Sequence, residues 1–151
     1  MPDRIFADAR FAAIYDDLDG DRDDLDHYER ITDELGAASV LDVGCGSGVL
    51  AIGACVFGAG HAMGVDIAPA AVPITLANAE ANGVAAQVEV STTDLADVEG
   101  TFDLVLANIL APTLVALSAD LKRVVAPGGA LVISGILTEA LAAEGADVLG
   151  I

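Results

Sequence analysis

Three glycines spaced two residues apart, Gly44, Gly46 and Gly48, follow a short apolar run in the segment S-V-L-D-V-G-C-G-S-G, which begins at Ser39. Glycine has no Cβ, so the backbone can turn sharply and a flat ligand can contact main-chain atoms. A largely apolar helical run begins at Val49, and the start of a helix offers N–H groups to a carboxylate or phosphate. The spacing predicts a ligand-binding turn between a strand and a helix. The alternative is a glycine-rich turn that binds nothing.

The glycine spacing also separates two classes of ligand. The dinucleotide fingerprint G-x-G-x-x-G/A, counted from Gly44, needs a small residue at the position of Val49. Valine does not satisfy this requirement, which argues against an NAD-dependent reductase. The pattern that is present is D-x-G-x-G-x-G, and it begins with Asp42 at the end of the predicted strand.

Predicted strands and helices alternate around this turn. Strands are expected at 40–43, 61–66, 87–90, 102–107 and 130–134, and helices at 49–57, 68–81 and 113–125. Apolar strands that alternate with helices are typical of a parallel sheet covered on both faces. We therefore expect an α/β fold, a Rossmann-like doubly wound and mostly parallel sheet in the order 3-2-1-4-5, with a sixth strand at most.

Polar side chains follow three of these strands at their carboxyl ends. Asp66 ends the second strand about twenty residues beyond the glycines, where an acid can accept both hydroxyls of a ribose; capping of the next helix is the alternative role. Asp94 follows the third strand and Asn108 the fourth, where Asn108 could instead satisfy the backbone of its own loop. Because the carboxyl ends of parallel strands face one crevice, we expect these side chains near the glycine turn.

Length and charge limit the function further. The 151 residues suit one domain with a sizeable core. The formal net charge is −18, with 24 acidic residues against six Lys and Arg, so the field of the protein should repel a phosphate backbone. We expect no nucleic-acid partner and favour a basic protein or a neutral or cationic small molecule. The alternative is that the charge serves solubility alone.

The sequence gives no sign of a metal site, a membrane span or a secretion signal. Cys45 and Cys55 lack metal-ligand spacing and suit small apolar residues in a reducing compartment. Residues 43–65 carry no formal charge, but glycines and His61 interrupt them, so we expect helix, turn and strand rather than a span. The mixed-charge N-terminus lacks the apolar core of a signal peptide. These features predict a soluble cytoplasmic protein that needs no metal.

The segment before the first strand is expected to form two helices, at 5–18 and from 23 or 24 to 35. The acidic stretch between them, 16–26, has some of the spacing of a calcium-binding loop. Tyr15 occupies the first ligand position of that loop, so we expect instead that Asp23 or Asp24 caps the second helix.

The pattern D-x-G-x-G-x-G resembles motif I of the class I S-adenosylmethionine (SAM) methyltransferases. This resemblance implies SAM as the cofactor, an acid on its ribose at Asp66, an acid and an apolar neighbour on its adenine at Asp94 and Leu95, and Asn108 beside the methyl group as the catalytic residue. The cofactor-binding residues that it implies are Asp42, Gly44, Cys45, Gly46, Gly48, Asp66, Ile67, Asp94, Leu95 and Asn108.

Within that superfamily, residues 39–138 resemble the PrmA-type enzymes, which methylate large-subunit ribosomal protein eleven. The narrower signatures are A-N-I-L-A, which ends at Ala111, and S-G-I-L, which begins at Ser134. The resemblance implies methyl transfer to lysine ε-amines and an N-terminal α-amine. We expect transfer to an amine of a protein or small molecule, with ribosomal protein as one acceptor; the alternative is a non-catalytic or incomplete SAM-binding domain.

Two departures from that family concern the ends of the chain. Residues 1–38 are too short for the substrate-recognition domain of these enzymes and resemble the entry or lid helices of small methyltransferases, so residues 39–151 form the expected SAM-binding core. The closing strands of the family sheet are expected to be truncated. An uncovered sheet edge favours pairing with a second copy, which predicts a homodimer or poor solubility.

Overall fold

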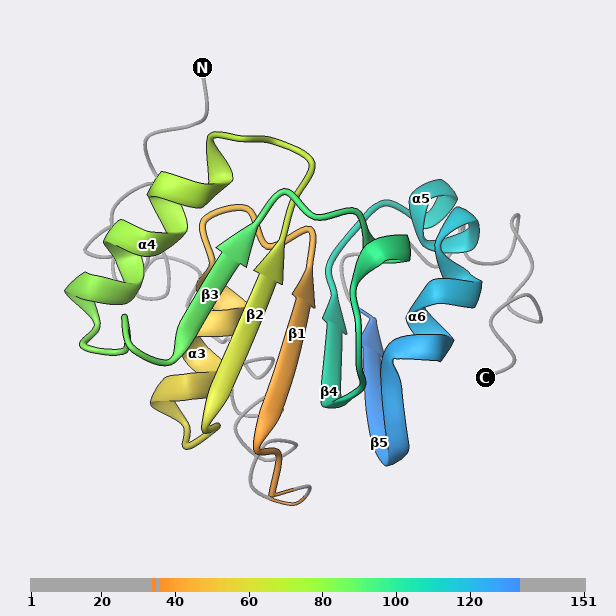
Figure 1. The fold of residues 1–151 in the computed structure, drawn as a ribbon, viewed down its shortest axis with the longest axis horizontal. Helices are drawn as coiled ribbons and strands as arrows, with labels where there is room; N and C mark the ends of the chain where they lie inside the picture. Colours follow the sequence, from red (N-terminus) through yellow and green to blue (C-terminus); the bar gives the residue numbers. More distant parts are fainter. Residues whose placement is uncertain (1–33, 35, 134–151) are drawn as a thin grey trace, which may run out of the picture.

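The computed structural model describes residue 34 and residues 36–133 (Figure 1). The predicted N-terminal helices, the acidic stretch and any strand after Ile133 lie outside these residues. The elements in chain order are β1 (Ser39–Val43), α3 (Val49–Val56), β2 (His61–Val65), α4 (Ala71–Ala81), β3 (Val88–Ser91), the short 3₁₀ helix η2 (Leu95–Asp97), β4 (Phe102–Ala107), α5 (Ala111–Ala116), α6 (Ser118–Val124) and β5 (Val125–Ile133).

The five strands form one sheet in the order β3-β2-β1-β4-β5, and every neighbouring pair is parallel (Figure 1). This order confirms the predicted doubly wound α/β fold. The register also aligns the carboxyl ends of the strands. Val43 pairs with Val65 on one side and with Ala107 on the other. The loops after β1, β2 and β4 therefore leave the sheet at the same edge, and the chain reverses its direction of winding between β1 and β4.

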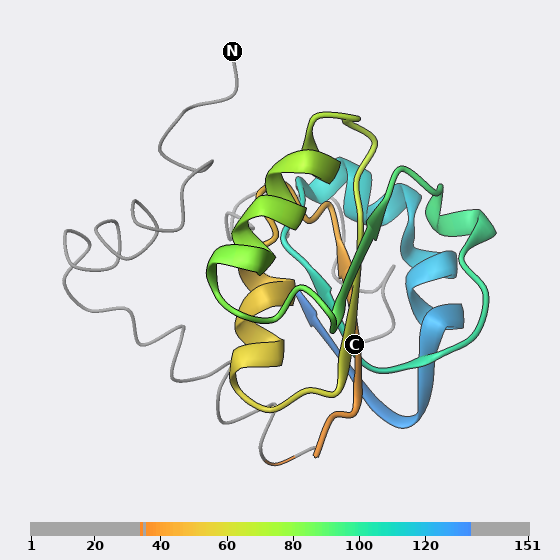
Figure 2. The ribbon, with the colours of Figure 1, turned by 60° about the vertical axis from the view of Figure 1, so that its left-hand side comes forward.

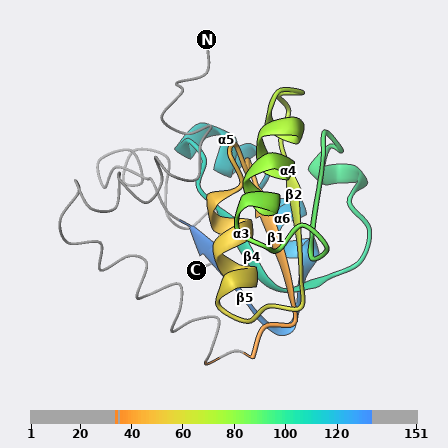
Figure 3. The same ribbon diagram turned by 90° about the vertical axis from the view of Figure 1, so that its left-hand side faces the viewer.

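Helices cover both faces of the sheet. In β1, Val40 packs with α3 and α4, whereas the next residue, Leu41, packs on the opposite face with η2, α5 and α6. This alternation is the period of two expected of a strand buried on both sides. Figures 2 and 3 show α3 and η2 on opposite sides of the strands.

Two predicted elements differ from the structure. The helix expected at 113–125 is divided at Leu117 into α5 and α6. The fifth strand begins earlier than expected, at Val125, and includes the Pro-Gly-Gly turn as an irregularity in its pairing with β4. A Cβ on Gly129 would lie 2.8 Å from the carbonyl oxygen of Asp103, so only glycine allows this close approach of two backbones.

At the amino ends of β1 and β4, the two strands are joined by a reciprocal set of hydrogen bonds. Oδ2 of Asp103 accepts from the N–H groups of Ala38 and Ser39, at 2.9 and 3.2 Å. The hydroxyl of Ser39 in turn accepts from the N–H of Asp103, at 3.1 Å. These bonds hold β1 and β4 together at the end of the sheet opposite to the glycine turn. Among the described residues, no helix is long and apolar enough to cross a membrane.

Candidate functional site

The glycine turn folds back on the end of β2. Gly44, Gly46 and Gly48 have φ values of 73°, 56° and 83°, in the left-handed region that glycine adopts without strain. The N–H groups of Gly44 and Cys45 both donate to the carbonyl oxygen of Val65, at 2.8 and 3.2 Å. The turn is therefore anchored to the neighbouring strand before α3 begins.

The three glycines serve different purposes. A Cβ on Gly44 would lie 2.6 Å from Cγ2 of Ile109, and a Cβ on Gly48 would lie 2.5 Å from Cγ2 of Thr75. A Cβ on Gly46 would have no atom within 4 Å. Gly44 and Gly48 thus allow close packing against Ile109 and Thr75, whereas Gly46 presents the open side of the turn, against which a ligand can lie.

Asp66 contacts the glycine turn directly, through the backbone of Gly46. Its Oδ2 accepts from the N–H of Gly46 at 2.9 Å, and its Oδ1 accepts from the N–H of Ala68 at 2.8 Å. The N-cap residue of α4 is Ala70, so Asp66 fastens the loop before the helix rather than capping the helix itself. The structure brings together the acid after β2 and the glycine turn after β1, across twenty residues of sequence.

The two predicted adenine contacts in the segment after β3 differ in exposure. Asp94 is exposed and is the N-cap of η2, where its Oδ1 accepts from the N–H of Ala96 at 3.3 Å. Leu95 is only 4% exposed, because its side chain packs in the core against the sheet. An apolar side chain in the loop after β2, that of Ile67, is 96% exposed.

The loop after β4 meets the glycine turn from the other side. Ile109 is half-buried and its Cγ2 occupies the space that a side chain on Gly44 would need. Asn108, one residue earlier, is exposed. Leu110 is 74% exposed and precedes α5. The loops after β1 and β4 therefore pack against each other through Gly44 and Ile109, and Asn108 is exposed at the same edge of the sheet.

Asp42 and Cys45 lie beneath the turn rather than on its surface. Asp42 is 1% exposed, and its Oδ2 accepts from the N–H of Ala51 in the first turn of α3, at 3.1 Å. Burial raises the pKa of Asp42 to about 7, the hydrogen bond from Ala51 lowers it, and the charge of Asp66 adds to the increase. Burial, together with the charge of Asp42, raises the pKa of the Cys45 thiol to about 12. Asp42 thus joins β1 to the start of α3, and Cys45 packs against Gly64 of β2.

Two buried polar residues of α4, which sequence reasoning did not single out, brace the turn. The hydroxyl of Thr75 donates to the carbonyl oxygen of Gly46 at 3.1 Å, and Nδ2 of Asn78 donates to that of Ser47 at 2.9 Å. Both side chains are buried. The signal that could have found them is their spacing of three residues on one face of an otherwise apolar helix surface.

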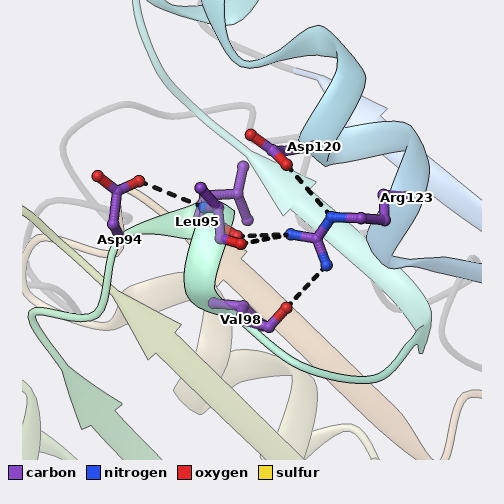
Figure 4. Close-up of polar contacts among 6 residues, drawn as sticks. Asp94, Leu95, Val98, Asp120 and Arg123 are labelled. Carbon is purple, nitrogen blue, oxygen red and sulfur yellow. Dashed lines mark hydrogen bonds and ion pairs between the residues drawn. The ribbon is translucent and has the colours of Figure 1, made fainter.

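Arg123, in the last turn of α6, is a further residue that the sequence did not reveal. Figure 4 shows its guanidinium aimed at the carbonyl end of η2. Its nitrogens donate to the carbonyl oxygens of Leu95 and Val98, both at 2.8 Å. The available signal was that Lys122 and Arg123 are the only basic residues after residue 30 apart from His61. No group of His, Cys, Asp and Glu in the described part of the chain is arranged to hold a metal ion.

Comparison with known proteins gives consistent family matches. The family model described as Ribosomal protein L11 methyltransferase (PrmA) matches residues 24–144. The ribosomal protein L11 methyltransferase of Geobacter sp. (strain M21) is 55% identical over 100 residues, which make up 66% of this chain and 33% of that protein. That of Dechloromonas aromatica (strain RCB) is 50% identical over 115 residues, 76% of this chain and 37% of that protein. The chain spans about a third of the length of the curated relatives it matches.

Solved structures agree with these matches. The crystal structure of ribosomal protein L11 methylase from Lactobacillus delbrueckii subsp. bulgaricus has a TM-score of 0.62 and 38% identity, and the match covers 70% of this chain and 59% of that chain. An RNA methyltransferase from Salinibacter ruber, in complex with S-adenosyl-L-homocysteine, has a TM-score of 0.67 and 25% identity, with 78% of this chain and 77% of that chain covered. Because the family model covers well over half of its residues, this chain belongs to the ribosomal protein L11 methyltransferase (PrmA) family.

Proposed function

We propose that this chain binds SAM at the carboxyl edge of its sheet and transfers the methyl group to an amine. The observation that carries the proposal is the hydrogen bond from the N–H of Gly46 to Asp66, because it joins the acid after β2 to the glycine turn after β1. Family membership supports the proposal. The Salinibacter ruber enzyme, with the same fold, binds the demethylated product of SAM.

The residues at this edge fit such a ligand. Asp66 would accept hydroxyl groups of a ribose beside Gly46, where a Cβ would meet no atom within 4 Å. Asp94 is exposed and would accept from the amino group of the adenine. The side chain of Ile67 offers an apolar surface to the ring. Asp42, Cys45 and Leu95 would contribute through the backbone that they hold in place, since their side chains are buried.

The chemistry requires alignment more than activation by the protein. SAM supplies a methyl group that is already activated by its sulfonium sulfur. The lone pair of a neutral amine would form the new N–C bond as the C–S bond breaks, and the resulting ammonium would release its proton to solvent. Asn108 is exposed at the end of β4, where its side-chain carbonyl could accept from an amine N–H and orient the lone pair. Ile109 and the glycine turn would exclude water from one side.

For the acceptor, we propose lysine ε-amines and the N-terminal α-amine of ribosomal protein L11. The names of the relatives support this choice, and so does the net charge of −18, which favours a basic protein partner. The second candidate is a SAM-binding domain that does not transfer the methyl group.

Cofactor binding is tested by calorimetric titration with S-adenosylhomocysteine. Asp66→Asn removes the charge that would accept ribose hydroxyls, so we expect its affinity to fall about 10- to 100-fold, as for loss of a charged hydrogen bond. Glu80→Gln removes an exposed acid near the end of α4, outside the proposed site, and serves as the charge-matched control, with wild-type affinity expected. Equal affinities of the Asp66→Asn variant and the wild type would contradict the proposed site.

Methyl transfer is tested with radiolabelled SAM and a panel of acceptors: ribosomal protein L11, lysine peptides and small amines. Label on L11 would support the proposed acceptor. Label only on small amines would support transfer with a different substrate. Binding of S-adenosylhomocysteine with no label on any acceptor would favour the second candidate.

A further inference from the structure

The short helix η2, which carries Asp94 at its start, is held at its other end by a single side chain from α6. Nη1 of Arg123 donates to the carbonyl oxygen of Val98 at 2.8 Å (Figure 4). Nη2 donates to those of Leu95 at 2.8 Å and Ala96 at 3.4 Å. Three carbonyl groups of one loop thus converge on one guanidinium, 25 to 28 residues away in sequence.

A three-residue 3₁₀ helix has too few internal hydrogen bonds to persist by itself. Here both of its ends are fixed. At the start, Asp94 accepts from the N–H of Ala96. At the end, Arg123 places a permanent positive charge and a planar fork of donors against the carbonyl groups, which carry the negative end of the helix dipole.

The ion pair with Asp120 is a minor contact of Arg123. Nε of Arg123 lies 3.2 Å from Oδ1 of Asp120 on the same helix, and the two side chains are 42% and 34% exposed. A solvent-exposed pair of this kind contributes little to stability. The other nitrogens of the guanidinium reach the η2 loop, so the main effect of Arg123 falls on the segment that carries Asp94.

We propose that Arg123 is a positioning residue for recognition of the adenine base. It fixes η2, and η2 in turn fixes the carboxylate of Asp94. Oδ1 accepts from the N–H of Ala96, so Oδ2 of this exposed residue is the oxygen that would meet a ligand at the sheet edge. This inference rests on the proposed function, because it takes Asp94 as the acceptor for the amino group of adenine. Arg123 itself would touch no part of the cofactor.

The experiment compares two ligands, S-adenosylhomocysteine and S-inosylhomocysteine, in which a 6-oxo group replaces the amino group. Wild-type protein is expected to prefer the adenosyl ligand by about tenfold or more, since the inosyl ligand turns a donor into an acceptor facing Asp94. Arg123→Met should reduce this ratio to about threefold or less by releasing the carboxylate. Arg123→Lys, which keeps the charge but lacks the fork, should give an intermediate ratio.

The matched control is Lys122→Met, which removes the same charge from the neighbouring exposed position of the same turn. It should keep the wild-type ratio. Amide hydrogen exchange provides a readout that needs no ligand. In Arg123→Met, the N–H groups of Asp97 and Val98, which bond within η2, should exchange about tenfold faster, while those of β1 stay unchanged and report an intact fold.

The outcomes separate the two hypotheses. If wild-type protein binds neither ligand, the proposed function fails and this inference fails with it. If it binds both equally, SAM-type binding stands but Asp94 does not read the amino group, and the inference is overturned. An unchanged ratio in Arg123→Met, with or without faster exchange, also overturns it. A reduced ratio with protected β1 amides and a wild-type ratio in Lys122→Met supports it.

Discussion

Asp42 is a carboxyl group without access to water, placed under the first turn of α3 with one backbone N–H as its hydrogen-bond donor. Burial raises its pKa from 3.8 to about 7. Between these values the unfolded chain has lost its proton while the folded chain keeps it. The folded state therefore loses stability, relative to the unfolded state, as the pH rises from about 4 to about 7, and no further change follows above that range.

The expected result is a difference between wild type and Asp42→Asn that depends on pH. Asparagine keeps a carbonyl acceptor for Ala51 but cannot ionise. As the pH rises through that window, the free energy of unfolding of the variant should therefore increase relative to that of the wild type, by at most about 1.4 kcal/mol per pH unit. Urea unfolding at several pH values between 4 and 9 measures the difference. A constant difference across that range would show that Asp42 does not titrate as described.

Gly46 and Gly83 offer a matched pair of substitutions. Both have positive φ, 56° and 72°, and a Cβ on either would meet no atom within 4 Å. Alanine at each should cost a similar ~1 kcal/mol or more of stability through backbone strain alone. Only Gly46→Ala should also weaken binding of S-adenosylhomocysteine, because its methyl group would enter the space proposed for the ligand. If calorimetry shows equal affinity for the two variants, the ligand does not lie against the open side of the turn.

The helix α4 acts on the site as a brace rather than as a source of ligand contacts. Thr75→Val keeps the shape of the side chain but removes the hydrogen bond to the carbonyl oxygen of Gly46. We expect a loss of about 1 kcal/mol of stability and several-fold weaker binding of S-adenosylhomocysteine. Thr75→Ser keeps the hydroxyl and should bind nearly as the wild type does. The prediction fails if the serine and valine variants bind equally, when both are measured well below their unfolding temperatures.

The elements that the sequence predicted well are those with local signals. The strand order, the glycine turn and the position of Asp66 follow from apolar runs, glycine spacing and the convergence of parallel strand ends. The split of α5 from α6 at Leu117 has no comparable signal, because both halves share one helical pattern of apolar residues.

Contacts between distant segments could not be predicted in the same way. Thr75 and Arg123 donate to carbonyl groups 29 and 25 to 28 residues away, and a backbone carbonyl has no sequence signature. The burial of Leu95 was missed for a related reason. The family resemblance implied that Leu95 contacts the adenine, but the conformation of η2 directs its side chain into the core.

The charge of the whole molecule should affect its stability. A net charge of −18 on 151 residues favours the expanded chain through self-repulsion, and salt screens this repulsion over about 10 Å at 0.1 M. We expect the midpoint of thermal unfolding to rise as sodium chloride increases from about 20 to about 300 mM, because the screening length shortens over this range. Calorimetric scans at constant pH measure the midpoint. A midpoint that falls or stays flat would mean that attractive pairs outweigh the repulsion.

The hydrogen bonds of Asp103 with Ala38 and Ser39 lie at the end of the sheet opposite to the glycine turn, yet they affect how the turn is aligned with the loop after β4. A slip of β1 along β4 by two residues would leave every side chain on its proper face, so burial alone penalises it weakly. Such a slip would carry Gly44 about 6.6 Å past Ile109, two strand residues at the usual rise. It would also strip Asp103 of both donors. The carboxylate of Asp103 thus stabilises the register of β1 and β4 in which the glycine turn and the loop after β4 face each other.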